Sequence, residues 1–147
     1  MSNPVSYKSK ADSRFMRILA FLLAIVGNKR FMEDFWTTVG TTLYYPTSVT
    51  NPMESRYRHI ITHELVHVEQ YKKWGLFYAV SYLLFPLPVG LAWFRWRWER
   101  EAYMVQLRVK PTTEQVEWVV ETLWSNYAWT WPKPWMRKWF LRELRLG

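Results

Sequence analysis

The sequence predicts a mostly helical α+β fold in a single domain, and three observations support this prediction. The chain has 147 residues, half of them hydrophobic, which suits one ordinary domain with its own core. Most of the chain carries apolar residues at helical spacing between Gly and Pro boundaries. Residues 35–46, FWTTVGTTLYYP, instead combine Thr, Val and aromatic residues as a strand or a short hairpin does, with the turn near Gly40.

The first helix is expected near the N-terminus. An apolar run from Ile18 to Val26 follows a basic lead, and Asp12 or Ser13 can open the helix while Gly27 ends it. The run resembles a weak signal peptide, but no small-x-small cleavage site follows Gly27. We therefore expect an amphipathic or buried helix here, with no clear cleavable signal peptide.

The second helix should begin near Asn51 and end at Trp74. Asn51 suits the N-cap position, Pro52 suits the first helical position, and Gly75 provides the stop. Residues 60–70, in the middle of this segment, should therefore lie on a helix and not on a loop.

Residues 75–94 carry no charge over twenty positions, which is long enough for a membrane-spanning helix. Pro86, Pro88 and Gly90 divide the stretch into two pieces of about ten residues, each too short to cross about 30 Å of hydrocarbon. Basic residues flank both ends and give no orientation bias. We expect two buried or interfacial segments around a proline elbow, in a protein that is soluble or membrane-peripheral.

Three further helices should complete the fold. One should end before Pro111, and Thr112 with Gln115 should open the next. Residues 112–147 should form the C-terminal helices. They carry an apolar stripe of Val116, Val119, Val120 and Leu123, and then a basic amphipathic tail with Trp135, Trp139, Phe140 and Leu144.

Composition narrows the possible functions. The chain has no Cys, which excludes disulfides, thiolate ligands and Cys nucleophiles, so any metal must bind to His and carboxylate groups. The net charge of +8 and the aromatic content of 19 % suit nucleic acid or an anionic surface. Because the basic residues are scattered and no nucleic-acid motif accompanies them, we expect no specific nucleic-acid partner. Peripheral contact with a membrane or another anionic surface stays open.

His63, Glu64 and His67 form the motif H-E-x-x-H. At this composition, chance would produce the motif in about 0.4 % of such chains. A helix places positions i and i+4 on one face, so His63 and His67 can offer two imidazoles to one cation. Two His and a carboxylate suit zinc with one open position, which lowers the pKa of a bound water toward about 7. Glu64 would take the proton of that water as it attacks a carbonyl.

The motif HELVH, followed by EREAY, resembles a zincin of the gluzincin type. The third ligand of these zinc peptidases is a Glu on a later helix that opens an E-x-x-A-D pattern, which matches Glu99, with Glu101 as the alternate ligand. Tyr103 stands where the pattern has an Asp that orients a ligand His, so that support must come from elsewhere. The whole pattern is similar to small proteins of tailed bacteriophages and bacteria, and it covers residues 36–106 as a minimal zincin-like core.

The resemblance implies a zinc-dependent metallopeptidase that hydrolyses a peptide or protein substrate. In zincins an edge strand beside the active-site helix pairs with extended substrate, and we expect this strand at residues Thr41 to Tyr45. His59 lies one turn before His63, too far along a straight helix to share the ion, because each turn rises about 5.4 Å. We expect His59 to contact substrate or to support the site, with plain solvent exposure as the alternative. Tyr103 either donates to an oxyanion or packs in the core.

A second hypothesis keeps the zinc without the catalysis. The ion would then stabilise a binding or structural protein that acts through a basic, Trp-rich surface, either in solution or at the periphery of a membrane. Glu64 beside an open coordination position favours the enzyme, because a purely structural zinc site needs no general base. The substrate and the oligomeric state stay open.

Overall fold

The computed structural model describes residues 4–25, 29–83, 92–126 and 131–146. These residues form a mostly helical α+β fold, which confirms the predicted class. The chain divides into two compact units, Met1–Lys72 and Lys73–Gly147.

The first unit contains a small sheet of three strands in the order β1–β3–β2. β1 (Ser6–Ser9) is parallel to β3 (Thr42–Tyr45), and β2 (Thr37–Val39) is antiparallel to it. β2 and β3 form the predicted hairpin. Its turn contains Gly40 at a φ of +63°, in the left-handed region that favours glycine.

The expectation that residues Thr41 to Tyr45 form an edge strand is wrong. β3 lies in the middle of the sheet, because β1 pairs along its second side with Ser6 opposite Thr42. The sequence of β1, SYKS, is short and polar, and it was not predicted as a strand. On the hairpin side, the free edge of the sheet belongs to β2.

The first helix begins where the sequence predicts. After a 3₁₀ turn at Lys10–Asp12, α1 (Arg14–Ile25) starts with the Oγ of Ser13 accepting a hydrogen bond from the Met16 N–H at 3.2 Å. The predicted stop at Gly27 lies outside the described residues. A short helix, α2 (Phe31–Asp34), follows before the hairpin.

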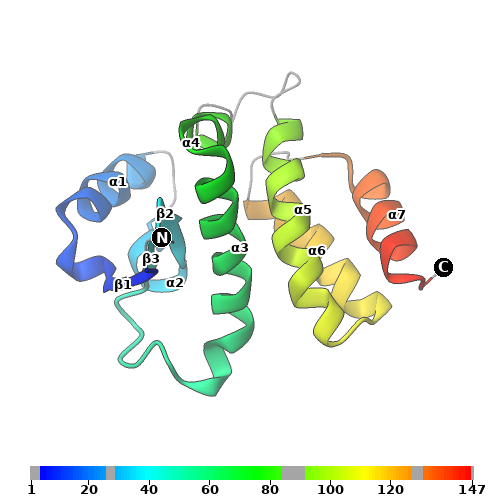
Figure 1. Cartoon of the computed structure of the whole chain (residues 1–147), viewed down its shortest axis with the longest axis horizontal. Helices are drawn as coiled ribbons and strands as arrows, with labels where there is room; N and C mark the ends of the chain where they lie inside the picture. The colour runs from blue at the N-terminus through cyan, green and yellow to red at the C-terminus, as the bar shows by residue number, and fades with distance from the viewer. Residues whose placement is uncertain (1–3, 26–28, 84–91, 127–130, 147) are drawn as a thin grey trace. The chain divides into compact units, whose positions relative to one another are not determined.

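The helix of the H-E-x-x-H motif, α3 (Arg58–Trp74), starts later than predicted. The Asn51 side chain accepts a hydrogen bond from the Met53 N–H at 3.0 Å and closes a turn instead of capping a helix. The chain then passes through a 3₁₀ turn (Ser55–Tyr57) before α3. The predicted stop is confirmed, with Gly75 at a φ of +53°. Figure 1 shows α1, α2 and the sheet on one side of α3.

The regular structure described in the second unit consists of helices alone. It contains α4 (Leu76–Leu83), α5 (Ala92–Val109), α6 (Thr113–Asn126) and α7 (Lys133–Leu144). The two apolar pieces of residues 75–94 therefore fall in different helices, while the proline elbow lies outside the described residues. Within the described ranges, no helix combines the length and the apolar character that a membrane crossing requires.

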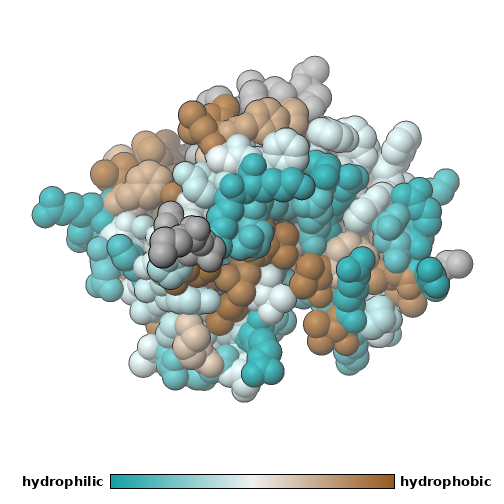
Figure 2. Space-filling model, viewed as in Figure 1, coloured by the Kyte–Doolittle hydropathy of each residue, from teal (hydrophilic) through white to brown (hydrophobic). Residues whose placement is uncertain are grey.

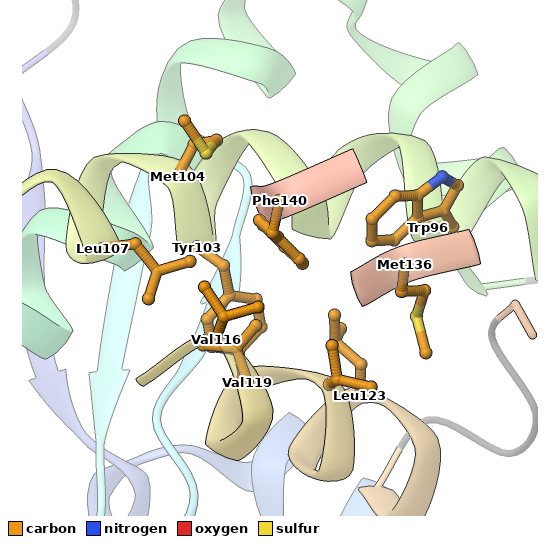
Figure 3. Close-up of a cluster of buried hydrophobic side chains, with 10 residues drawn as sticks. Trp96, Tyr103, Met104, Leu107, Val116, Val119, Leu123, Met136 and Phe140 are labelled. Atoms are coloured by element: carbon orange, nitrogen blue, oxygen red, sulfur yellow. The ribbon is translucent and has the colours of Figure 1, made fainter. Parts of the chain in front are cut away.

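The core of the second unit lies among α5, α6 and α7 (Figure 3). The predicted stripe on α6 is confirmed, because Val116, Val119, Val120 and Leu123 are all fully buried. The Thr112 hydroxyl accepts a hydrogen bond from the Gln115 N–H at 3.2 Å and opens α6 as expected. The ten buried side chains of this core are Trp96, Tyr103, Met104, Leu107, Val116, Val119, Val120, Leu123, Met136 and Phe140.

Candidate metal centre

The two histidines of the motif face each other on α3. Both His63 and His67 are buried, and their Nε2 atoms lie 3.3 Å apart. The rings are nearly perpendicular, with an interplanar angle of 77° and centroids 5.0 Å apart. The spacing of four residues thus aims two ring nitrogens at the same point, as the sequence predicts.

This separation suits a shared zinc ion. Zinc–nitrogen bonds of about 2.0–2.1 Å at the tetrahedral angle place two ligand nitrogens about 3.3–3.4 Å apart. The observed distance of 3.3 Å falls in that range. An N–H···N hydrogen bond between the two rings would have a similar length, so a metal analysis decides between the two arrangements.

Gln70 orients the second histidine. The Nδ1–H of His67 donates to the Oε1 of Gln70 at 2.9 Å, which leaves the Nε2 lone pair of His67 available to a metal. Gln70 is itself buried, three residues after His67 on the same helix. The sequence predicted that support for a ligand His must come from a residue other than Tyr103, and this amide gives His67 a partner of that kind. The sequence carried a signal for it, since positions i and i+3 of a helix are neighbours.

Glu64 is held by the edge strand of the sheet. Thr38, in the middle of β2, donates its hydroxyl proton to the Oε2 of Glu64 at 2.7 Å. Glu64 is 8 % exposed, so its carboxylate is largely shielded from bulk water. The hairpin and the motif helix therefore meet at the predicted general base. Sequence reasoning did not find Thr38, because the 26 residues between the partners leave no local signal.

Lys10 is a charged side chain that sequence reasoning missed. It is fully buried, its Nζ donates to the Phe31 carbonyl oxygen at 2.8 Å, and it lies over the Phe31 ring at 3.5 Å from the centroid. Burial lowers the pKa of Lys10 to about 7, and the negative charge of Glu64 opposes part of that shift. Lys10 thus belongs to the electrostatic environment of the predicted base. Lysine is almost never fully buried, so no residue pattern predicted this position.

In the second unit, Glu99 is the buried carboxylate of α5. It is fully shielded from solvent, and the Tyr82 hydroxyl of α4 donates to its Oε1. Burial raises the pKa of Tyr82 well above its usual range, and the negative charge of Glu99 adds to the shift. The Tyr82 hydroxyl therefore stays protonated and acts as a donor. Arg95 fixes the same segment by donating to the Tyr82 carbonyl oxygen at 3.2 Å.

The two candidates for the third ligand differ in environment. Glu101 is 40 % exposed at its side chain and forms an ion pair with Arg97, one turn earlier on α5. Glu99 is fully buried. A buried carboxylate carries a large desolvation penalty unless a donor or a cation compensates for it, and this difference favours Glu99.

The remaining predicted site residues have different surroundings. His59 is exposed, which agrees with the plain alternative, and its contact with substrate stays a prediction. Tyr103 is buried in the core of the second unit, with its ring edge-on to Trp118 at 6.5 Å between centroids. This position agrees with a packing role, and its donation to an oxyanion likewise stays a prediction.

Comparison with protein-family models, with curated proteins and with solved structures finds no match to this chain. The resemblance to gluzincins therefore rests on the motif residues themselves, and the function must be argued from their chemistry.

Proposed function

We propose that the protein is a zinc-dependent metallopeptidase in which His63, His67 and Glu99 hold the ion. All three side chains are buried, and each can offer one ligand atom to a metal. The observation that carries the proposal is the 3.3 Å separation of the two histidine Nε2 atoms, because it suits two ligands of one tetrahedral ion. Two histidines and a carboxylate are a donor set that zinc accepts in hydrolytic sites.

Bound zinc in such a site acts as a Lewis acid and activates water for attack on a carbonyl. The residues of this chain supply the rest of the chemistry. Glu64 accepts the proton of the attacking water and then delivers it to the leaving amine. Thr38 holds the Glu64 carboxylate at 2.7 Å and fixes its direction. Gln70 fixes the ring of His67, so the base and one ligand are both preorganised.

The exposed edge of β2 gives the substrate a docking route. An extended peptide can add to a free strand edge through main-chain hydrogen bonds. In this sheet that edge belongs to the strand of Thr38, the residue that contacts Glu64. We therefore assign the substrate-pairing role to β2 (Thr37–Val39) in place of β3.

The first experiment measures metal content and hydrolysis together. Protein purified without chelator should contain about one zinc per chain, as measured by inductively coupled plasma mass spectrometry. The His67→Ala variant should contain none. Glu64→Gln should retain the zinc and the fold while hydrolysis of a quenched fluorescent peptide library falls by about 10²–10⁴-fold.

Glu69→Gln is the matched control. Glu69 is exposed and pairs with Lys72 at 2.8 Å, so its loss should change neither zinc content nor hydrolysis. Wild-type protein without metal, and indifferent to added zinc, would contradict the metal site. Zinc-loaded Glu64→Gln with undiminished hydrolysis would instead contradict only the role of Glu64.

A second candidate function rests on α7. Trp135 is 67 % exposed, and the helix lines a surface cavity of about 520 Å³. The lining residues are Pro134, Trp135, Lys138, Trp139 and Arg142. Cations beside indole rings suit an anionic or aromatic ligand, so a zinc-stabilised binding protein is the alternative. A binding activity that Glu64→Gln leaves intact, in protein that hydrolyses nothing, would favour this function.

A further inference from the structure

α1 presents an apolar face to solvent. Its exposed hydrophobic side chains lie on one arc of about 120° of the helix circumference, given about 100° per residue. They are between 53 % and 69 % exposed, and they are Phe15, Ile18, Phe21, Leu22 and Ile25. Figure 2 shows hydrophobic side chains gathered over α1, as located in Figure 1.

The opposite face of α1 is also apolar. It packs toward α2 and the 3₁₀ turn before α1, with Met16 fully buried. A surface helix normally carries mainly polar residues on its solvent-facing side, whereas α1 carries five large hydrophobic side chains there. The outer face of α1 therefore suits a partner that is itself apolar.

The charges around this face are positive and not neutralised. α1 contains Arg14 and Arg17 and no acidic residue. Among the residues that the structure describes, neither Arg forms an ion pair, and the same holds for the exposed Lys29 after the helix. By contrast, the next residue, Arg30, pairs with Asp34 at 2.8 Å. The free cations thus accompany the apolar face and not the rest of the segment.

We propose that α1 is a membrane-surface helix whose outer face inserts into the headgroup region of an anionic bilayer. Side chains such as Phe, Leu and Ile enter the acyl boundary, while arginines and lysines remain with the anionic headgroups. The helix spans 12 residues, about 18 Å, which is too short to cross about 30 Å of hydrocarbon. It therefore lies along the surface of the bilayer. This assignment does not depend on the zinc site or on hydrolysis.

A second copy of the chain is a less suitable occupant of this face. In a symmetric dimer the same patch meets itself, so Arg14 and Arg17 of both copies would lie in one interface, and they would lie close together where the two α1 helices run parallel. No acidic residue of α1 offsets that repulsion, and the chain as a whole carries +8. An anionic lipid surface instead turns the same charges into an attraction.

The test uses the absence of cysteine from the chain. Single cysteines introduced as Ile18→Cys, Phe21→Cys and Ile25→Cys can each carry an environment-sensitive dye in the full-length protein. Vesicles of phosphatidylcholine with about one third phosphatidylglycerol should shift the emission of all three to the blue. Val109→Cys is the matched control, because Val109 is 78 % exposed at the end of α5 and should show no shift.

Sedimentation with the same vesicles measures the energetics. Phe21→Glu should weaken vesicle binding by about tenfold or more, because it removes a large apolar side chain and adds a negative charge. Arg14→Gln with Arg17→Gln should weaken binding to anionic vesicles and leave the weak binding to pure phosphatidylcholine unchanged. Circular dichroism establishes whether each variant folds. If Phe21→Glu does not fold, the cysteine scan still tests the proposal, because it uses other variants.

Three results would overturn the proposal. In the first, no dye position on α1 responds to any vesicle. In the second, the vesicles bind but only Leu76→Glu with Phe77→Glu, on the exposed face of α4, removes the binding. In the third, the wild type is a dimer in solution that ignores vesicles, and Phe21→Glu makes it monomeric. That result would assign the face to a second copy of the chain.

Discussion

The two units bury different kinds of side chain. Among the described residues of the first unit, five buried side chains are hydrophobic and five are polar or charged. Of the buried side chains that the structure describes in the second unit, thirteen are hydrophobic and two, Ser81 and Glu99, are polar. Four of these polar side chains belong to the motif helix itself, and the fifth, Lys10, comes from the 3₁₀ turn before α1. In the described part of the second unit, the one buried carboxylate is Glu99.

This difference separates stability from chemistry. An apolar core stabilises the fold in proportion to the surface that it removes from water. For buried polar and charged groups, the cost of desolvation offsets most of the energy of their interactions. We therefore expect most of the stability to come from the second unit and most of the site chemistry from the first.

The largest effect should come from truncating the core of the second unit. Phe140 is fully buried among α5, α6 and α7, so Phe140→Ala should lower the free energy of unfolding by about 3–5 kcal/mol. Urea denaturation measures this change. Trp135→Ala, on the exposed side of the same helix, should stay within about 0.5 kcal/mol of wild type. Equal losses of unfolding free energy in the two variants would show that the apolar core of the second unit is not the main source of stability.

The second effect is a pH dependence specific to the first unit. The pKa of Lys10 is about 7 in the folded protein and 10.5 for an ordinary lysine, so the unfolded chain binds more protons between these values. Burial of Lys10 therefore costs no stability above pH 10.5, where the side chain is neutral in both states. The free energy of unfolding falls as the pH is lowered from 10.5 to about 7. From pH 9 to pH 7, wild type should lose about 2 kcal/mol more than Lys10→Met.

Denaturation at the two pH values measures this difference, and tyrosine and histidine titrations cancel in it. Lys8→Met is the control, because Lys8 is exposed and should give the wild-type slope. A Lys10→Met variant with the same slope as wild type would show that Lys10 is protonated and solvated in the folded protein.

The third effect concerns the orientation of His67. Gln70→Ala removes the acceptor of the His67 Nδ1–H and should weaken zinc binding by about tenfold, or about 1.4 kcal/mol. Competition with a fluorescent chelator measures the affinity. Glu69→Ala, at the exposed neighbouring position, should leave it unchanged. Unchanged affinity in Gln70→Ala would mean that His67 is oriented by other contacts.

The smallest effect compares one kind of bond in both units. Ser13 caps α1 in the first unit and Thr112 caps α6 in the second, each through a bond of 3.2 Å. Ser13→Ala and Thr112→Ala should each destabilise by about 1 kcal/mol. If both shift one shared thermal transition, the units unfold together. Two transitions, with each variant shifting only one, would show that the units unfold separately.

The sequence predicted those features that local patterns determine. The hairpin at Gly40, the stop at Gly75 and the stripe on α6 follow from turn chemistry and periodicity, and all three are confirmed. The motif spacing also predicted that His63 and His67 face each other. Each of these features depends on residues that are close together in the chain, so it can be predicted without knowledge of the tertiary contacts.

The remaining features depend on contacts between distant residues. β1 was not predicted because SYKS has little strand character of its own, and its pairing with β3 made the expected edge strand a central one. The late start of α3 reflects a turn at Asn51 that competes with a helix cap. Thr38 and Lys10 reach the neighbourhood of Glu64 only through the tertiary fold.

The pairing of β1 with β3 also affects the order of folding. Ser6 lies opposite Thr42, 36 positions later, so the sheet can close only after a long loop has been brought together. Contacts between distant residues form slowly, whereas neighbouring helices such as α6 and α7 form their contacts early. During synthesis, β1 is made before β3, so its pairing must wait until β3 is available. We therefore expect the contacts between α6 and α7 to form faster than the sheet. The hydrogen bond from Thr38 to Glu64 should be among the last to form.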